Sequence, residues 1–211
     1  MKTICLSTAY LAPVSYYCQM MGAERVLIEQ HEHYIKQTYR NRANIATANG
    51  VMPLTIPVEH AKGEKILMRD LRIRDHGNWR HLHWQALQAA YDKSPFFEFY
   101  TDEFAPFYEG KPTRYLLDFN MKMQELVTSL LNLSVTPTLT QTYEKEGDFT
   151  DLRYTISPKM PCTIENLKPY YQVFAQRHGF MPDLSIVDLL FNMGPEALLV
   201  LNDGCKRQIV S

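Results

Sequence analysis

Two short apolar runs near the start of the chain, residues 3–7 and 25–29, flank a stretch that begins at Pro13 and ends at Gly22. The runs are partly β-branched, which favours strands, and the stretch between them favours a helix. A strand, helix, strand unit joins two parallel strands and places the loop at residues 8–15 at the carboxyl end of the first strand. Open α/β sheets bind ligands there, although this loop lacks the glycine patterns of dinucleotide and P-loop sites.

A β-hairpin is predicted in the next segment, around Asn49-Gly50. The runs 44–48 and 51–58 on either side are compatible with strands, and Asn-Gly is the strongest short hairpin signal. Two prolines in the second arm cannot donate to a ladder, so we expect this arm to pair on one side only. A further short strand is expected at residues 66–73.

The middle of the chain has the spacing of helices. Apolar residues recur at intervals of three and four over residues 78–94, 96–108 and, most regularly, 113–132. This pattern predicts three helices, and the third is the expected central packing helix. Residues 77–133 could form a helical subdomain within a single domain that covers residues 1–211.

The last third of the chain predicts three more strands and one helix. The strands are expected at residues 138–143, 151–156 and 170–175, and the helix runs from Asp183 or Ser185, as its cap, to Asn192. The tail after Asp203 is polar and is expected to fray. The whole pattern predicts an α/β fold. In it, a strand-helix-strand start with a mixed sheet and a β-hairpin is packed by the helical middle segment and a C-terminal helix.

Composition narrows the class of protein. The chain has 211 residues with 22 basic and 23 acidic side chains, a formal net charge of -1. This balance gives no basic surface that would recruit nucleic acid or acidic membranes, so neither is an expected partner. The four cysteines form no CxxC pair. The apolar start is a poor signal peptide and is too short to span a bilayer, so a cytoplasmic location is expected.

The densest polar cluster, residues 31–42, follows the second predicted strand, where loops of α/β proteins carry function. Its content suggests that it binds anions. Arg40 and Arg42 can offer bidentate forks to phosphate or carboxylate, and Lys36 offers a point charge. Neutral donors in the same cluster are Tyr34, Tyr39 and Asn41. The alternative is a solvated basic loop, because charge runs are usually surface features.

Histidines are candidates for metal binding and for acid–base chemistry. His31 and His33 would share one face of a strand, but no third ligand stands at a recognised distance, so no metal site is predicted and no cofactor is specified. His83 lies one turn after Trp79 on the apolar face of a predicted helix. It is either a core group with a hydrogen-bonded partner or a general base that lines a cleft.

Polar residues also line one ridge of the last predicted helix. Ser185, Asp188 and Asn192 are three and four residues apart. They indicate capping and a buried hydrogen-bond network, because polar groups in so apolar a helix need partners. A Ser–His–Asp site built from Ser185, His83 and Asp188 is disfavoured, since no GxSxG elbow is present and a capping serine has its oxygen engaged.

Sequence blocks spread over roughly residues 3–194 carry a resemblance to a known family. They are Tyr10-Leu11-Ala12-Pro13 with Tyr16-Tyr17, the segments 34–42 and 54–58, Trp79 with His83 and Tyr91, the segment 94–97, Tyr171-Gln172, and the segment 182–192. In these blocks the chain resembles the WbqC-like family of bacterial proteins. It departs from many relatives at residues 144–168, which lack a Gly/Ser-rich stretch, and in the first loop, which lacks their Gln-Pro and Pro-Trp pairs.

The family is associated with O-antigen and other surface polysaccharides. The resemblance therefore implies a cytoplasmic transferase or related enzyme that modifies a nucleotide-activated, amino-bearing sugar. Under this hypothesis His83, as a base, and Asp188 are the catalytic candidates. The substrate-binding candidates from the same blocks are Tyr10, Pro13, Tyr34, Lys36, Arg40, Asn41, Arg42, Trp79, Tyr91, Gln172, Ser185 and Asn192.

A hypothesis from a different class makes the chain a non-catalytic binding or scaffold subunit of a glycan-assembly complex. Its contact face would be the aromatic-rich segment from Trp79 to Tyr108. The two hypotheses predict different positions for Trp79, His83, Arg42 and Asp188, which an enzyme would bring into one pocket. The family blocks further predict that the loop after the second strand, the Trp79 helix and the Asp188 helix meet. The sequence does not fix the oligomeric state.

Overall fold

The computed structural model of the protein describes residues 2–61, 63–164 and 167–206. The N-terminal part of the chain contributes to a four-stranded parallel sheet. Its strand order is β5-β2-β1-β6. The strands are β1 (Thr3–Ser7), β2 (Arg25–Glu29), β5 (Thr138–Leu139) and β6 (Thr150–Asp151). The parallel pairing of β1 with β2, joined by α1 (Val14–Met21), confirms the predicted strand, helix, strand start.

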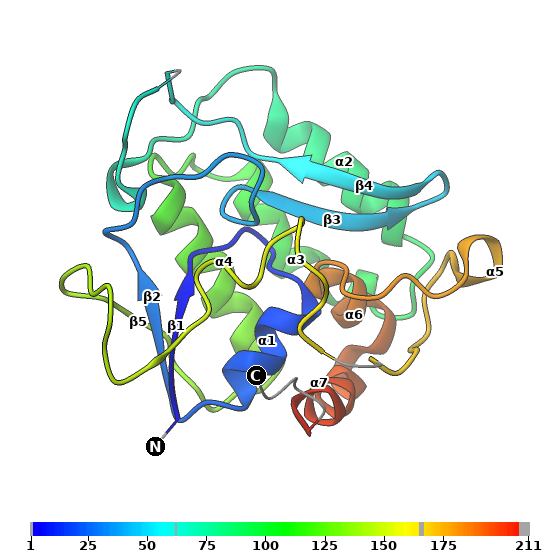
Figure 1. The fold of residues 1–211 in the computed structure, drawn as a ribbon. Coiled ribbons are helices and arrows are strands. Elements are labelled where there is room, and N and C mark those ends of the chain that lie inside the picture. Colours follow the sequence, from blue (N-terminus) through cyan, green and yellow to red (C-terminus); the bar gives the residue numbers. More distant parts are fainter. Residues whose placement is uncertain (1, 62, 165–166, 207–211) are drawn as a thin grey trace.

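The two faces of this sheet have different environments. Ile4, Leu6, Val26 and Ile28 point into the main hydrophobic core, because alternate side chains of a strand share a face. Figure 1 shows α1 on that side, with α6 (Ile186–Met193) and α7 (Ala197–Lys206) beyond it. The loop at residues 140–149 lies on the opposite side of the sheet. The second face of the sheet is therefore covered by a loop and not by a helix.

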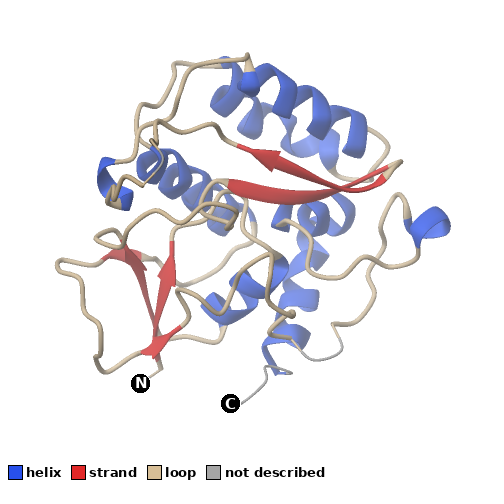
Figure 2. Cartoon of the chain, turned by 45° about the horizontal axis from the view of Figure 1, so that its top comes forward, coloured by secondary structure: helices blue, strands red, loops and turns tan. Residues whose placement is uncertain are grey.

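The predicted hairpin is confirmed and forms a sheet of its own. β3 (Arg42–Thr47) pairs antiparallel with β4 (Gly50–Thr55), and the turn residue Gly50 has a φ of 100°, a conformation that favours glycine. Among the described residues β4 pairs only with β3, as its two-stranded sheet requires. The parallel and antiparallel pairs expected of one mixed sheet are thus divided between two sheets. Figure 2 shows the hairpin beneath α2 (Trp79–Tyr91).

The three predicted middle helices are also confirmed. They are α2, α3 (Phe97–Glu109) and α4 (Leu116–Leu130). α4 buries Leu116, Phe119, Met123 and Val127, whose spacing of three and four places them on one face. This face packs into the main core, as expected for a central helix. In the described part of the chain, no helix has the length and apolar character needed to cross a membrane.

Two predicted strands are wrong, and the strands predicted at residues 138–143 and 151–156 are limited to β5 and β6. Residues 66–73 contain a 3-10 turn, η1 (Met68–Asp70), and their backbone bonds go to several separate segments: Met68 N donates to Glu32 O, and Ile73 N donates to Arg114 O. Residues 170–175 form no strand: residues 173 and 174 are in a turn that leads into the short helix α5 (Ala175–His178). In both segments the apolar spacing reflects anchoring of side chains in the core and not a strand ladder.

The end of the chain also differs from the prediction. α6 is the predicted helix, but the 3-10 turn η2 (Gly194–Glu196) and α7 follow it and continue the helical structure to Lys206. α7 was not predicted, and it buries Ala197, Leu201 and Gly204. The tail expected to fray after Asp203 is helical to Lys206, and its remainder, residues 207–211, lies outside the described residues.

Candidate functional site

The carboxyl ends of the parallel strands meet at one edge of the main sheet. Ser7, Glu29 and Asp151 end the three neighbouring strands β1, β2 and β6. The chain passes from β1 to β2 on one side, whereas β6 joins on the other side, so the strand order reverses between β1 and β6. Open α/β sheets bind their ligands outside the carboxyl ends at such a switch point. The candidate site is therefore expected at this edge.

A buried ion pair lies at this edge. Arg40 donates from Nε to Glu32 Oε1 at 2.9 Å, and from Nη2 to Glu32 Oε2 at 2.6 Å and to Ser7 Oγ at 2.8 Å. The side chains of Arg40 and Glu32 are only 3% and 0% exposed. The third nitrogen, Nη1, donates to no acceptor among the described residues. It is thus the nitrogen that remains to bind a ligand.

A second buried arginine, Arg153, lies beside the first. It donates from Nε and Nη2 to both carboxylate oxygens of Asp151, at 2.9 and 2.6 Å, and from Nη1 to Glu29 Oε2 at 3.2 Å and to Glu144 O at 2.9 Å. Burial acts to raise the pKa of Asp151, but the hydrogen bonds from Arg153 outweigh it and lower that pKa. The same hydrogen bonds to Asp151 raise the pKa of Arg153, which stays charged. The rings of Tyr143 and Phe149 lie 4.9 and 5.6 Å from its guanidinium carbon.

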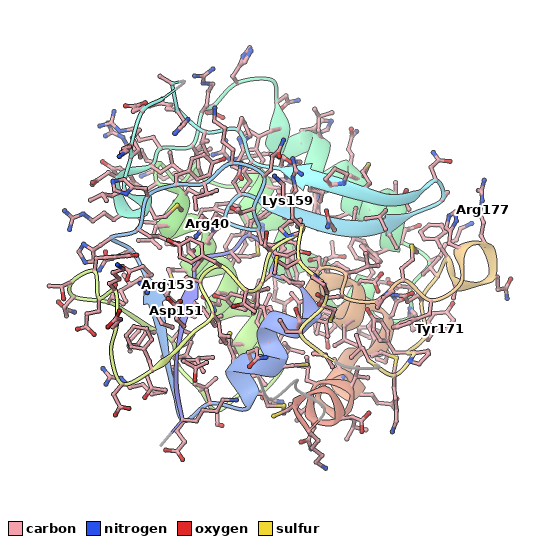
Figure 3. All side chains as sticks on the ribbon, in the orientation of Figure 1. Arg40, Asp151, Arg153, Lys159, Tyr171 and Arg177 are labelled. Atoms are coloured by element: carbon pink, nitrogen blue, oxygen red, sulfur yellow. The ribbon has the colours of Figure 1, made fainter. Side chains whose placement is uncertain are left out.

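A cavity of about 170 Å³ opens above the two arginines. Its lining contains four cationic side chains, those of Lys36, Arg40, Arg153 and Lys159, and no carboxylate. The other lining residues are Ile35, Gln37, Thr38, Tyr154, Ile156 and Ser157. Figure 3 labels Arg153 beside Asp151, Arg40 above them, and Lys159 farther up in the same view. We call this space the cationic cavity. Arg40 and Arg153 are paired with Glu32, Glu29 and Asp151, so among the described residues the positive charge that suits an anionic ligand comes from Lys36 and Lys159.

The structure divides the predicted polar cluster at residues 31–42. Lys36 and Arg40 line the cationic cavity, as the hypothesis of an anion site requires. Asn41 is buried and donates from Nδ2 to Ile56 O at 2.8 Å. Arg42 starts the hairpin and donates to Thr55 Oγ1 at 3.3 Å, and Tyr34 packs edge-on against the ring of His60. The last three therefore do not line the cationic cavity.

His83 and Tyr10 form a second, buried group under α2. The Tyr10 hydroxyl lies 3.1 Å from His83 Nδ1 and 2.8 Å from the Tyr108 hydroxyl. The Trp79 ring packs edge-on against the imidazole at 5.1 Å between centroids. Burial lowers the pKa of His83 to about 4, although a backbone hydrogen bond at Thr55 acts the other way. His83 is thus a neutral core histidine with hydrogen-bonded partners.

We expect His83 to make the stability of the protein depend on pH. An unfolded histidine takes up a proton as the pH falls below about 6.5, whereas folded His83 stays neutral down to about pH 4. The unfolded state then binds more protons, so stability falls as the pH falls. Between pH 7 and about 4.5, wild type should lose roughly 2–3 kcal/mol more than His83→Gln. Urea denaturation of both proteins at the two pH values measures this difference, and equal losses would contradict the assignment.

Asp188 is the centre of a third buried group. Its carboxylate accepts hydrogen bonds from the Tyr91 hydroxyl at 3.0 Å, the Tyr170 hydroxyl at 2.8 Å and Gln172 Nε2 at 2.8 Å. Asn192 donates to the backbone oxygen of Asp188 at 2.7 Å. Burial raises the pKa of Asp188, and these side-chain hydrogen bonds act to lower it. The predicted buried network of this helix is confirmed.

Replacing Asp188 with asparagine should destabilise the protein by about 2 kcal/mol, because the new amide would leave a buried donor facing other donors. The variant Asp102→Asn, on the exposed surface of α3, should stay within about 0.5 kcal/mol of wild type. Urea denaturation at neutral pH gives both values. If Asp188→Asn unfolds at the same urea concentration as wild type, the carboxylate is not needed as the acceptor of three bonds.

Ser185 holds the N-cap position of α6, as predicted, but its side chain makes no cap hydrogen bond. The Ser185 hydroxyl instead donates to Leu11 O at 2.7 Å and accepts from no backbone N–H of its own helix. The Asp183 carboxylate instead accepts from Ser15 N at 2.8 Å and Ser15 Oγ at 3.0 Å, so it caps the start of α1 from a distant part of the chain. Pro13 forms an isolated bridge with Ser185. These contacts hold the first loop, in which Leu11 has a φ of 41°.

The Trp79 helix and the Asp188 helix do meet, in the interior, and the third segment in this contact is β3 instead of the loop after the second strand. Tyr91 on α2 joins Asp188 on α6 and also accepts a hydrogen bond from Ala46 N on β3. Ser185 N donates to Asn44 O on the same strand. Trp79, His83, Arg42 and Asp188 are absent from the lining of the cationic cavity. The substrate and catalytic roles that the resemblance implies for these residues stay predictions.

Sequence reasoning missed the half of the site that comes from residues 144–168. Arg153 and Lys159 lie there, as do Tyr154 and Ser157. The strand predicted at residues 151–156 was a signal that could have found them. If that strand pairs parallel in the main sheet, its carboxyl end lies at the same edge as Arg40. Within the described residues, no group of three His, Cys, Asp or Glu side chains is placed to hold a metal ion.

Comparison with known proteins agrees with the resemblance. The family model described as WbqC-like protein family matches residues 8–164, a range that includes both arginines and ends before the Asp188 block. An uncharacterised protein of Mycobacterium tuberculosis (strain ATCC 25618 / H37Rv), Rv1507c, is 24% identical over 93% of this chain and 95% of its own length. No solved structure matches. The family match covers more than half of the sequence, and the chain therefore belongs to the WbqC-like protein family.

Proposed function

We propose that the chain is a cytoplasmic transferase that binds a nucleotide-activated sugar by its diphosphate and acts in surface-polysaccharide biosynthesis. The observation that carries the proposal is the cationic cavity, with four positive side chains and no carboxylate at the switch point of a parallel sheet. The family name adds the polysaccharide context. The sugar nucleotide is the proposed partner.

Different residues of the cavity would contact different parts of a bound diphosphate. Arg40 is held in place by Glu32 and Ser7. Its Nη1 can therefore bind the ligand without the entropic cost of ordering a flexible side chain. Lys36 and Lys159 are exposed and come from two different loops, so they can approach the phosphates from two directions. Charge-assisted hydrogen bonds of this kind are about twice as strong as neutral ones.

Exposed aromatic rings beside the cavity suit the nucleoside or the sugar. Tyr154 lines the cavity and is 51% exposed. The centre of its ring lies 5.7 Å from the guanidinium carbon of Arg40. Tyr143 is 46% exposed and stacks over Arg153. Rings held by buried cations in this way offer a rigid face on which a base or a sugar ring can stack.

A second cavity gives an acceptor a place to bind. It measures about 300 Å³, lies on the loop-covered face of the sheet, and is lined by Glu29 and Glu144, to which Arg153 is hydrogen-bonded. Three threonines, Thr138, Thr140 and Thr142, add hydroxyl groups to the lining. Carboxylates and hydroxyls suit an acceptor that carries amine or hydroxyl groups. Arg153 would then stand between donor and acceptor.

The catalytic assignments to His83 and Asp188 stay part of the proposal as predictions from the family resemblance. Both side chains are buried and hydrogen-bonded, His83 at 6% and Asp188 at 0% exposure. A base needs hydrogen-bond contact with the proton it removes. These residues therefore act on substrate only if the interior opens, and they otherwise support the site.

Calorimetric titration with a panel of UDP-, GDP- and dTDP-sugars tests the proposal. At least one should bind wild type, and Lys159→Ala should weaken its binding by about tenfold, since a charge-assisted hydrogen bond contributes about 1.5 kcal/mol or more. Lys145→Ala removes an equally exposed lysine that does not line the cavity, and it should bind like wild type. No binding by any sugar nucleotide, or equal losses in the two variants, would overturn the proposal.

The scaffold hypothesis has less support. Its contact face was the aromatic segment of α2 and α3, but Trp79, Trp84, Phe97, Phe104 and Tyr108 are all buried in the core. Leu82 and Phe99 are exposed, at 56% and 73%. Single exposed apolar side chains are normal on a protein surface and do not make a docking face.

A further inference from the structure

A small chamber lies beneath the cationic cavity and shares Arg40, Arg153 and Ile156 with its lining. Its volume is about 10 Å³, which is room for roughly one water-sized group. Thr8, directly after β1, lines the chamber and is only 1% exposed. The chamber is therefore the innermost part of the candidate site, at the carboxyl end of the central strand.

The hydroxyl of Thr8 has no hydrogen-bond partner among the described residues. The other polar groups nearby are engaged: Ser7 Oγ donates to Arg153 O at 2.9 Å and accepts from Arg40, and the Tyr16 hydroxyl donates to Ser7 O at 2.9 Å. A buried hydroxyl without a partner costs about 1–3 kcal/mol of desolvation. Such a cost persists in a folded protein when the group serves a ligand.

We infer that the chamber is a subsite for one non-bridging phosphate oxygen of the ligand. Thr8 and Arg40 both line the chamber, and among the described residues Thr8 Oγ1 and Arg40 Nη1 have no hydrogen-bond partner. Both can donate, and a phosphate oxygen only accepts, so the pair matches an anionic oxygen. The size of the chamber admits this single atom and excludes a sugar ring or a base. This inference rests on the proposed function and fixes which end of the ligand lies deepest.

Inorganic pyrophosphate is the probe, titrated calorimetrically into wild type and three variants of Thr8. Thr8→Ser keeps the hydroxyl and should bind within about twofold of wild type. Thr8→Ala and Thr8→Val lack it and should bind at least about tenfold more weakly, since a hydrogen bond to a charged group is lost. Serine and alanine remove the same methyl group, so their comparison isolates the hydroxyl.

Thermal unfolding without ligand gives a second readout. Thr8→Val should keep or raise the Tm, by up to about 2–4 °C, because an unpartnered buried hydroxyl is replaced by a methyl group of similar shape. Thr163→Val is the matched control: its hydroxyl also lacks a partner among the described residues but lies outside both cavities, so pyrophosphate affinity should not change.

Two results would overturn the inference alone. The first is that wild type binds pyrophosphate but Thr8→Ser and Thr8→Ala bind it with equal affinity, as expected if a permanent water fills the chamber. The second is a Tm of Thr8→Val well below that of wild type. Failure of wild type to bind pyrophosphate would instead overturn the proposed function and, with it, this inference.

Discussion

Replacement of Arg40 with methionine is expected to lower the free energy of unfolding by about 3–5 kcal/mol, the range found when one partner of a buried ion pair is removed. Methionine keeps much of the length of the side chain but leaves the Glu32 carboxylate, which is 0% exposed, without its partner. Among the described residues, both carboxylate oxygens bond only to Arg40. Urea denaturation at neutral pH measures the loss.

The double variant Arg40→Met with Glu32→Leu separates the orphaned charge from lost packing. It removes both charges, and a buried pair replaced by apolar residues is often neutral in stability. We expect it to recover most of the stability that the single variant loses, yet to bind no sugar nucleotide tightly. A single variant within about 1 kcal/mol of wild type would show that the pair is not a buried support of the site.

Removal of both lysines of the cationic cavity is expected to weaken sugar-nucleotide binding by about 100-fold while leaving stability nearly unchanged. Each lysine contributes a charge-assisted hydrogen bond worth about tenfold in affinity. Both are exposed, so Lys36→Ala with Lys159→Ala should unfold within about 1 kcal/mol of wild type. Calorimetry and urea denaturation of the same preparation test the two halves of this prediction.

A matched double variant, Lys111→Ala with Lys145→Ala, has the same change of net charge. Both of these lysines are exposed and lie outside the lining of the cavity. Long-range attraction alone would make the two double variants equally weak, so a difference between them indicates direct contact of the cavity lysines with the ligand. Equal affinities would show that net charge, and not the cavity, attracts the ligand.

The sequence predicts those parts of the fold that are specified locally. The first strands, the hairpin at Asn49-Gly50 and the helix from Leu116 to Leu130 have strong short-range patterns, and each is confirmed. Residues 66–73 carry the apolar pattern of a strand but make only isolated bridges, to His33, Val58 and Tyr115, and residues 170–175 carry it without forming a strand. Strand pairing is a tertiary property, so alternation alone over-predicts strands.

The candidate site could be predicted only in part for a similar reason. Lys36 and Arg40 belong to one dense cluster that follows a strand, and composition marks them as anion-binding candidates. Arg153 reaches the same place through the pairing of β6 with β1, across a separation of 146 residues for its contact with Ser7. No periodicity within one segment reports such a contact.

The role of each polar residue depends on its partner. Asp188 was predicted to need partners in an apolar helix, and the structure supplies Tyr91 from a helix 97 residues away. Ser185 and Asp183 have the sequence signature of a cap, but their side chains hold the first loop and α1 instead. Residue type and spacing indicate that such a side chain needs a hydrogen-bond partner. The tertiary fold determines which group is that partner.

The most direct test of the account is a crystal structure of the chain with a sugar nucleotide that calorimetry shows to bind. The diphosphate is expected in the cationic cavity, with phosphate oxygens about 2.7–2.9 Å from Arg40 Nη1 and Lys159 Nζ. One further oxygen should lie beside Thr8 Oγ1. A diphosphate bound anywhere else, with the cavity of Lys36, Arg40, Arg153 and Lys159 unchanged, would contradict it.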